Sequence, residues 1–540
     1  MRLDIEYRLK GKEEFLHTEL GNEDLKVELL EVGDRHTVKV TALKDLTLIR
    51  GKIDQVHKFE PNDVFPTNGY QSWTDTKERV FRKKEKERNV FKIPKVLLNA
   101  YAFDKYGDAV FYPYKPNTVH GYDIFYIKGN KEIFSYNYNY RNAYLIFEVH
   151  YSTKSLDVLS DIYGVDLKKG ESFIVYDMYF GNSYEKGLEN FKNDFALLEG
   201  NKIFGYTSWY NYYQNINESI ILRDLDSLDS RFGLFQIDDG YETFVGDWLD
   251  VDQNKFPNGF KSIVDKIHEK GYKAGIWLAP FVAETKSKLF NEHIDWFKRD
   301  EKGELAKCGG NWSGFYALDL DKKEVQEYIK KCLKHYVDLG FDFFKLDFLY
   351  ASSIAPTPGK SRAMMTREAY QMLKDILKGK IILGCGANCF SSYQMFDYLR
   401  VGPDVSLKFD DIWYMKFMHR ERISTKVTLQ NTIYRSIFNN RLFLNDPDVF
   451  LLRKENIQMN DKQKEALLTI NALFGSVLMT SDNIATYDEK TKALLEEKLN
   501  LFYRACNVSY KKKGNKIDIY YQLDDKKNKI TYNTKKGTLS

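Results

Sequence analysis

The sequence predicts a multidomain chain that combines α/β and all-β parts: a central (β/α)8 barrel, an N-terminal β-sandwich and a small C-terminal antiparallel β-domain. Three observations support this prediction. The 540 residues exceed what a single hydrophobic core usually organises. Strand-like segments dominate at first, strands then alternate with helices, and strand-like segments return near the end. We therefore expect domains at 1–190, 191–490 and 491–540.

The first of these parts carries short β-branched and aromatic runs. VKVTAL (38–43), YLIFEVHY (144–151) and FIVYDMYF (173–180) are typical of strands. Residues 124–136, IFYIKGNKEIFSY, hold two such runs around Gly129-Asn130, which indicates a hairpin. An antiparallel sandwich is predicted for this part.

The central part contains eight short apolar runs separated by helical segments such as 259–271 and 323–340. The runs are IFGYTSW (203–209), LFQIDDG (234–240), AGIWLAP (274–280), FFKLDFL (343–349), IILGCG (381–386), YLRVGPD (398–404), RLFLND (441–446) and SVLMTSD (476–482). Such alternation is typical of βα units around a parallel sheet, and eight units over about 280 residues fit a closed barrel.

The last part returns to strand signals. IDIYYQL (517–523) and ITYN (530–533) flank the polar segment DDKKNK, which predicts another hairpin with 524–529 as its loop.

Composition excludes several classes of function. The net charge of +4, from 81 basic and 77 acidic residues, does not form the strong basic field of a nucleic-acid binder. We find no uncharged apolar run of membrane-spanning length, and the first residues have no apolar signal core. Five cysteines do not indicate a disulfide framework, and Cys385 and Cys389 lack the second pair of a zinc site. We expect a cytoplasmic protein with no nucleic-acid or membrane partner, and a homo-oligomer stays open.

The eight runs are apolar at their start and become polar at their C-terminal ends. These ends carry Trp209, Asp238, Asp239, Trp277, Lys345, Asp347, Cys385, Arg400, Asp404, Asn445, Asp446 and Asp482. In a parallel barrel such ends form the mouth in which active sites are built.

Side-chain alternation groups the charges further. Lys345 and Asp347 are two residues apart and share one face of their strand, and Arg400 and Asp404 share a face in the same way. An ion-pair plug inside the barrel is the alternative to a polar cup. Buried ion pairs are weak stabilisers, so several of them built for stability alone are disfavoured.

Two carboxylates on different strands suit acid–base or nucleophilic chemistry at a glycosidic bond. Lys345 favours the charged form of Asp347, which suits a nucleophile, whereas the charge of Asp347 raises the pKa of Asp404 against the opposing effect of Arg400. Trp209 and Trp277 add apolar platforms for a sugar face. No His lies at a strand end and no HExxH or GxGxxG motif follows a strand, so a His-ligated metal or a dinucleotide is not indicated.

Six motifs occur in register along the barrel: QIDDGY (236–241), GIWLAP (275–280), FKLDFLYA (344–351), LGCG (383–386), LRVGPDV (399–405) and FLNDPD (443–448). With them the chain resembles glycoside hydrolase family 36, in the branch that contains bacterial α-galactosidases. The resemblance extends to NGYQSW (68–73), where this family carries a Trp on a loop that reaches the barrel mouth.

The resemblance implies a retaining double displacement with no metal or organic cofactor. It implies Asp347 as the nucleophile and Asp404 as the acid/base. The substrate-binding residues that it implies are Asp238 and Asp239 at the 4- and 6-hydroxyls, Lys345 at neighbouring hydroxyls, Arg400 and Cys385 near the 2-position, and Trp73, Trp209 and Trp277 in the walls.

The activity that the resemblance implies is exo-acting hydrolysis of terminal α-linked galactose from oligosaccharides of the melibiose and raffinose type. One departure bears on the 2-position: ANCFSS (387–392) follows LGCG, where the branch usually continues with Ser-Pro. An α-N-acetylgalactosaminidase therefore stays open, as does a transglycosylase. A non-catalytic glycan-binding protein and a lyase or isomerase barrel are alternatives from other classes, and a binder would not need both Asp347 and Asp404.

Overall fold

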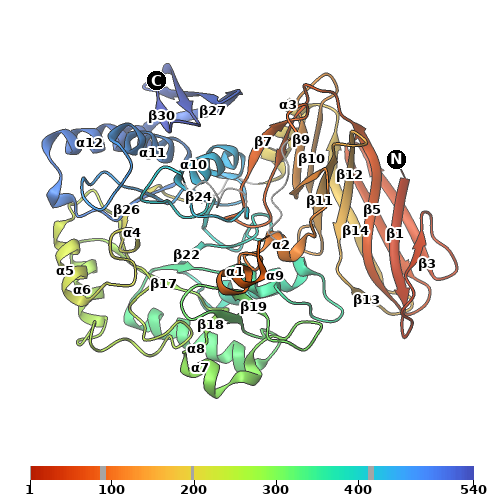
Figure 1. Ribbon diagram of the computed structural model, residues 1–540, viewed down its shortest axis with the longest axis horizontal. Helices are drawn as coiled ribbons and strands as arrows, with labels where there is room; N and C mark the ends of the chain where they lie inside the picture. Colours follow the sequence, from red (N-terminus) through yellow and green to blue (C-terminus); the bar gives the residue numbers. More distant parts are fainter. Residues whose placement is uncertain (1, 85–92, 196–199, 411–418) are drawn as a thin grey trace.

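The chain is described by a computed structural model that covers residues 2–84, 93–195, 200–410 and 419–540. Figure 1 shows an N-terminal pair of sheets on one side, a central barrel with its helices on the other, and a small C-terminal sheet above the barrel. The predicted fold class is confirmed.

The N-terminal part is a sandwich of two antiparallel sheets. The first has the order β2 (Leu16–Thr18), β1 (Arg2–Leu9), β5 (Leu46–Lys58), β12 (Ser155–Asp161), β11 (Tyr144–His150) and β8 (Thr118–Tyr122), with β13 (Val165–Leu167) paired to β5. The second has the order β3 (Leu25–Val32), β4 (Arg35–Ala42), β14 (Ser172–Gly181), β10 (Ile133–Asn137) and β9 (Ile124–Ile127). In β4, Val38 and Val40 alternate with the exposed Lys39 and enter the apolar core that both sheets share. The predicted hairpin is confirmed, with Ile127 opposite Ile133.

The barrel is a parallel sheet that places every predicted apolar run on a strand. In chain order the strands are β15 (Ile203–Thr207), β16 (Leu234–Ile237), β17 (Lys273–Leu278), β21 (Phe343–Leu346), β22 (Ile381–Gly384), β23 (Tyr398–Arg400), β24 (Leu444–Asp446), β25 (Val449–Phe450) and β26 (Val477–Thr480). The sheet has nine strands because the chain resumes as β25 after the seventh run, beyond Pro447, which lacks an N–H, and Asp448, whose φ is 73°. Strand β24 pairs with β23, and strand β25 pairs with β26, so these two consecutive strands close the barrel.

The helices that accompany these strands are α4 (Trp209–Tyr212), α5 (Glu218–Ser227), α6 (Lys261–Glu269), α7 (Lys288–Glu292), α8 (Lys323–Leu339), α9 (Arg362–Ile376), α10 (Thr425–Tyr434), α11 (Asp461–Phe474) and α12 (Glu489–Arg504). Helices α6 and α8 occupy the two helical segments that the sequence predicts. In α8, Val325, Ile329 and Leu333 recur at helical spacing and are buried, and Gly340 ends the helix with a φ of 105°.

The C-terminal sheet has the order β27 (Cys506–Lys513), β28 (Lys516–Leu523), β29 (Lys526–Asn533) and β30 (Thr538–Leu539). The hairpin loop is shorter than predicted, because only Asp524 and Asp525, with φ values of 51° and 63°, form the turn. The lysine-rich segment after them is strand, and its exposed lysines keep their charges in water at a sheet edge. Domain limits at residues 190 and 490 stay a prediction; α3 (Tyr184–Asp194) and α12 span them.

Among the residues that the structure describes, no helix has the length and apolar character needed to cross a membrane.

Candidate active site

A cavity of about 520 Å³ opens at the C-terminal ends of the barrel strands. Eight of the side chains proposed from the sequence line it: Trp73, Trp209, Asp238, Asp239, Trp277, Lys345, Asp347 and Asp404. Strand order places Asp347, after β21, and Asp404, after β23, on two strands with β22 between them. The two carboxylates therefore face one cup from alternate strands.

Asp347 is held by two donors. Trp277 Nε1 donates to its Oδ2 at 3.0 Å, and the backbone N–H of Phe348 donates to its Oδ1 at 2.9 Å. Phe348 reaches this position with a φ of 55°, which turns the chain out of the strand directly after the aspartate. Two N–H groups on a carboxylate fix its orientation, as a nucleophile requires.

Lys345 forms an ion pair with Asp238 at the floor of the cavity. Its Nζ lies 2.8 Å from Asp238 Oδ2, which also accepts from Gln236 Nε2 at 2.6 Å. Burial alone would lower the pKa of Lys345, but the charges of Asp238 and Asp347 outweigh it and raise the pKa. The floor thus carries a charged donor beside a charged acceptor, a combination suited to sugar hydroxyls.

Asp239 belongs to a second group on the same wall. Trp312 Nε1 donates to its Oδ2 at 2.9 Å, and Gln214 Nε2 donates to its Oδ1 at 3.2 Å. Burial raises the pKa of Asp239, and burial together with the charge of Asp239 raises the pKa of the adjacent Glu242 well above its usual range. Glu242 therefore keeps its proton to higher pH than an isolated carboxyl and supports Asp239 from behind the wall.

Asp404 differs from Asp347 in having a cation as its partner. Its side chain is 33% exposed, and Arg400 Nη1 lies 3.0 Å from its Oδ1. Burial raises its pKa, with a further contribution from the charge of Asp347, and Arg400 and Lys345 only partly oppose this. Arg400 is shared with Asp446 and Asp448, each at 2.9 Å, which reduces its effect on Asp404. A carboxyl that keeps its proton to higher pH suits a general acid.

The loop that carries Trp73 comes from the N-terminal part and is fixed by the barrel. It connects β6 (Val64–Thr67) to β7 (Lys77–Val80). Arg435, fully buried, donates to the carbonyls of Gly69 at 3.2 Å, of Gln71 at 3.0 Å and of Ser72. It also donates to the carbonyl of Val401 at 2.9 Å. One guanidinium therefore joins this loop to the strand end that leads to Asp404.

Cys385 and Arg400 do not line the cavity but lie behind its wall. Trp73 Nε1 donates to Cys385 Sγ at 3.2 Å, and a Cβ on Gly386 would meet the Trp73 ring at 3.2 Å. The ANCFSS segment that follows is turned toward the N-terminal loop, where Ser72 N–H donates to the carbonyl of Ala387 at 2.9 Å. Its departure from the expected pattern therefore faces this loop and not the cavity.

Comparison with known proteins tests this resemblance. Residues 206–376 match the family model described as Melibiase. The resemblance to glycoside hydrolase family 36 that the motifs predict is thereby confirmed.

Sequence relatives of the chain are distant. It is 29% identical over 225 residues, 37% of its length, to an A type blood alpha-D-galactosamine galactosaminidase of Flavonifractor plautii, and 29% identical over 150 residues, 26% of its length, to the alpha-galactosidase Mel36A of Lactobacillus acidophilus. The matched stretches span only 20% of the length of either relative.

A solved structure shares the fold over most of the chain. The alpha-galactosidase TtGalA from Thermus thermophilus, in complex with p-nitrophenyl alpha-D-galactopyranoside, superposes with a TM-score of 0.72 at 23% identity, covering 93% of this chain and 98% of that chain.

More than half of the residues that line the cavity were not predicted from the sequence. The additional lining residues are Phe103, Tyr106, Gln214, Asn311, Trp312, Phe348, Pro403, Ser406, His419, Glu421 and Ile423. A Trp between glycines, GGNWSG (309–314), was a usable signal for Trp312. It lies between β19 (Lys307–Gly309) and β20 (Phe315–Ala317) in a small sheet that β18 (Val282–Glu284) completes.

Three potential metal ligands meet elsewhere, on the sandwich. Within the described ranges, Glu148, His150 and Asp157 bring their ligand atoms within 4.8 Å of one another. Cations already occupy this cluster: Lys52 Nζ is 3.2 Å from Asp157 Oδ2, and Lys115 pairs with Glu148. Hydrogen bonds to Asp157 and Glu148 raise the pKa of His150 to about 9, so it is protonated at neutral pH, when a metal would need it neutral. We assign the cluster as an ion-pair network.

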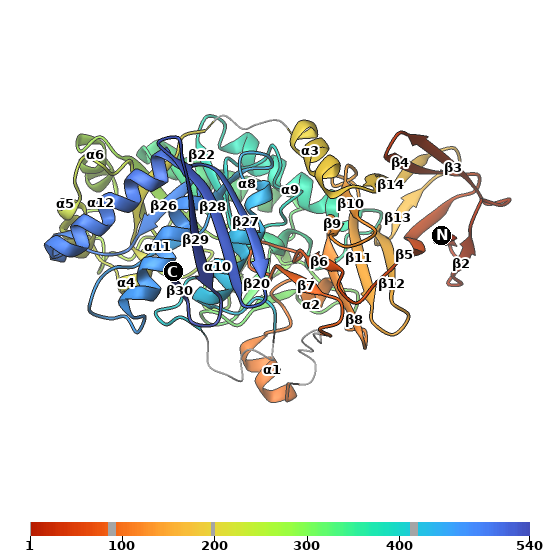
Figure 2. The same ribbon diagram turned by 90° about the horizontal axis from the view of Figure 1, so that it is seen from above.

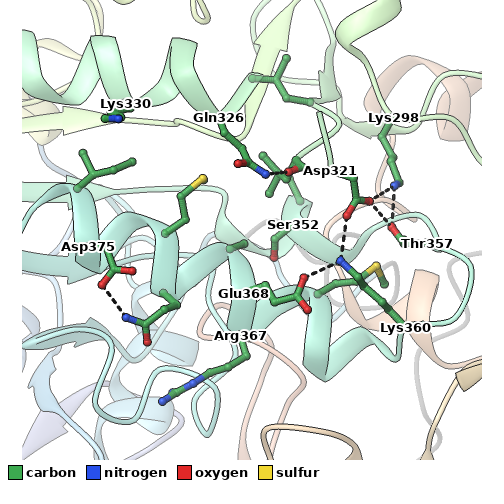
Figure 3. A pocket seen from close by; sticks show the side chains of 18 of the residues that line it. Lys298, Asp321, Gln326, Lys330, Ser352, Thr357, Lys360, Arg367, Glu368 and Asp375 are labelled. Carbon is green, nitrogen blue, oxygen red and sulfur yellow. Dashed lines mark hydrogen bonds and ion pairs between the residues drawn. The ribbon is translucent and has the colours of Figure 1, made fainter. Parts of the chain in front are cut away.

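A larger depression, of about 940 Å³, lies on the outer wall of the barrel beside α8 and α9 (Figure 3). Several of its charged groups are paired with one another: Lys360 Nζ lies 3.1 Å from Asp321 Oδ1 and 2.7 Å from Glu368 Oε2, and Lys298 Nζ lies 3.0 Å from Asp321 Oδ2. None of the strand-end residues lines it. The smaller cavity, which the strand-end carboxylates line, is therefore the better candidate for the active site.

Proposed function

We propose that the protein is a retaining, exo-acting α-galactosidase that removes terminal α-linked galactose from oligosaccharides of the melibiose and raffinose type. One observation carries the proposal: Asp347, oriented by two N–H donors, and Asp404, with a raised pKa, line the same cavity. The match of residues 206–376 to the Melibiase family model supports it, as does the shared fold of an α-galactosidase bound to an aryl galactoside.

In the first step, the Asp347 carboxylate attacks the anomeric carbon while Asp404 gives its proton to the glycosidic oxygen. The carbon–oxygen bond to the leaving group breaks, and a β-linked galactosyl ester of Asp347 forms. In the second step, Asp404, now ionised, takes a proton from a water molecule that attacks the same carbon from the other face. Two inversions give net retention, and both carboxyl groups return to their starting states.

The polar floor accounts for recognition of the sugar in this proposal. Asp238, Lys345 and Asp239 hold the hydroxyls remote from the reacting carbon, and Trp209 and Trp277 cover the apolar faces of the ring. Because the floor is closed by the Lys345–Asp238 pair, the cavity admits the end of a glycan chain, which fits exo-acting cleavage.

An α-N-acetylgalactosaminidase is the second candidate, and the wall near the 2-position argues against it. Trp73 lies against Cys385 and Gly386 and separates them from the cavity, which favours a hydroxyl over the larger acetamido group beside them. A non-catalytic glycan binder would not need both Asp347 and Asp404 in one cavity.

The test measures kcat/KM for p-nitrophenyl α-galactoside and for its 2-acetamido analogue, with the anomer of the released sugar followed by NMR. We expect preference for the galactoside, with α-galactose formed first. Preference for the acetamido analogue would select the second candidate. Release of β-galactose, or full activity of Asp347→Ala, would contradict the proposed mechanism.

A further inference from the structure

Trp312 lines the cavity from a strained turn. It lies in the loop 309–314 and has a φ of 53°. A bulky side chain is rare in this left-handed region, and it stays there only where the surrounding contacts hold it. Trp312 Nε1 donates to Asp239 Oδ2 at 2.9 Å, and its ring centroid lies 6.2 Å from that of Trp277 and 5.1 Å from that of Phe348. The strained turn therefore places an N–H donor on a carboxylate that the proposed function assigns to a sugar hydroxyl.

The loop of Trp312 is not part of the parallel barrel sheet. The strands on either side of it, β19 and β20, belong to the separate small sheet that β18 completes. Figure 2 shows β20 beside helix α1 (Lys95–Tyr101), and Lys307 Nζ of β19 donates to the carbonyl of Asn99 in this helix at 3.1 Å. The position of Trp312 relative to Asp239 therefore depends on contacts between loops.

Glu284, the last residue of β18, connects the loop of Trp312 to the loop of Asp239. Its Oε2 accepts from the Ser313 N–H at 3.2 Å and from Ser313 Oγ at 2.6 Å, directly after Trp312. Its Oε1 accepts from the N–H of Val245 at 3.0 Å, in the loop after β16 that also carries Asp239. One carboxylate thus links the two segments that meet in the Trp312–Asp239 hydrogen bond.

The contacts of Glu284 require a carboxylate. The residue is 6% exposed, and among the described residues its side chain has no ion pair with a basic group. Its three partners are all donors, so an amide in its place would bring an NH2 group against one of them and lose the link to one loop. A buried acid with no cation beside it is unfavourable for folding, so its presence here indicates a task that a neutral side chain does not perform.

We propose that Glu284 is a positioning residue that holds Trp312 on Asp239 and thereby sets the preference of the enzyme for substrates that carry the hydroxyl bound by Asp239. The inference rests on the proposed function and adds a specificity determinant that does not itself line the cavity. A site built to hydrogen-bond a hydroxyl discriminates strongly against an analogue that lacks it, provided that its polar groups keep their orientation.

The test measures kcat/KM for p-nitrophenyl α-galactoside and for its 4-deoxy and 6-deoxy analogues. Asp239→Asn shows which hydroxyl Asp239 binds, because it lowers the galactoside-to-analogue ratio for the analogue that lacks this hydroxyl. We expect Glu284→Gln to lower the same ratio roughly five- to twentyfold, as the weakening of one hydrogen bond to a charged group implies. An unchanged ratio in Glu284→Gln would overturn the inference.

The matched control is Asp247→Asn. Asp247 is another buried carboxylate in the loop after β16, and it accepts from the N–H groups of Lys288 at 2.8 Å and Leu289 at 3.0 Å, on α7 and away from Trp312. This variant should leave the ratio within about twofold.

A second background tests whether Glu284 acts through Trp312. Trp312→Phe keeps an aromatic ring and removes the N–H, so Glu284→Gln should change the ratio less than about twofold in this background. Equal losses with and without the indole would overturn the inference.

A readout without substrate separates this inference from the proposed function. In protein labelled with 5-fluorotryptophan, the ¹⁹F signal of Trp312 is identified by its absence from Trp312→Phe. We expect Glu284→Gln to shift or broaden this signal and Asp247→Asn to leave it in place. If the wild type cleaves no α-galactoside, the proposed function fails, and an unchanged Trp312 signal in Glu284→Gln would then overturn the role of Glu284 as well. Ser313→Ala, which removes only the hydroxyl bond to Glu284, takes the place of Glu284→Gln in both measurements if that variant does not fold.

Discussion

Replacing Asp404 by alanine removes the group that we assign as the proton donor. The change should spare the fold, because Arg400 keeps Asp446 and Asp448, each at 2.9 Å, and because Asp404 is partly exposed. We therefore expect the free energy of unfolding to change by at most about 1 kcal/mol. General acid catalysis contributes about 10²- to 10⁴-fold in rate, which corresponds to about 3–5 kcal/mol in the barrier for a leaving group that needs a proton.

The assay is kcat/KM of Asp404→Ala on melibiose and on p-nitrophenyl α-galactoside. This parameter reports the first irreversible step, so the loss of base function in the second step does not obscure it. Melibiose should lose about 10²- to 10⁴-fold, whereas the aryl substrate, whose leaving group departs as a stable anion, should lose less than about tenfold. Asp448→Asn is the matched control, since it also touches Arg400 but lies outside the cavity and should affect both substrates equally. Equal losses on both substrates in Asp404→Ala would refute the acid role.

Three further changes test supporting groups. Glu421→Gln should raise the free energy of unfolding at about pH 7 by up to about 3 kcal/mol and leave it unchanged near pH 4. The reason is that the folded-state pKa of Glu421 is raised to about 8, so wild-type stability falls as the pH rises from the unfolded to the folded pKa. Calorimetry at both pH values checks this, and an equal effect at both would contradict it. Trp277→Phe removes a donor from Asp347 and should lower kcat about 10- to 100-fold in steady-state assays, a loss that a change in KM alone would contradict. In Arg435→Lys, the lysine cannot donate to several carbonyls of the Trp73 loop at once. The change should therefore lower kcat/KM markedly when Trp73 is present but little in a Trp73→Ala background. Equal losses in both backgrounds would show that Arg435 does not act through Trp73.

The barrel and its mouth were predictable because each strand carries its own signal. Apolar runs with polar ends mark the strands and their direction, so Asp347 and Asp404 could be placed at one rim from sequence alone. The break in the seventh strand could have been suspected from Pro447, but its two-sided pairing depends on closure of the whole sheet.

The aromatic end of the cavity could not be predicted, because it is assembled from segments with no local pattern. Phe103 and Tyr106 come from the N-terminal part, and His419 and Glu421 come from a segment more than 300 residues later in the chain. Arg435 was equally hidden, since an arginine directly after a helix is usually a surface residue and its burial follows from carbonyls on a distant loop. The position of Cys385 behind the cavity wall depends on the loop that carries Trp73, because Trp73 Nε1 donates to Cys385 Sγ.

The central claim is that Asp347 forms the covalent bond to the sugar. It is tested most directly by the product that Asp347→Gly forms from p-nitrophenyl α-galactoside in the presence of azide. The variant without azide should be inactive, and azide, entering the space of the lost carboxylate, should restore release of p-nitrophenol and yield β-galactosyl azide after one inversion. Formation of the α-anomer, or full activity without azide, would contradict the claim.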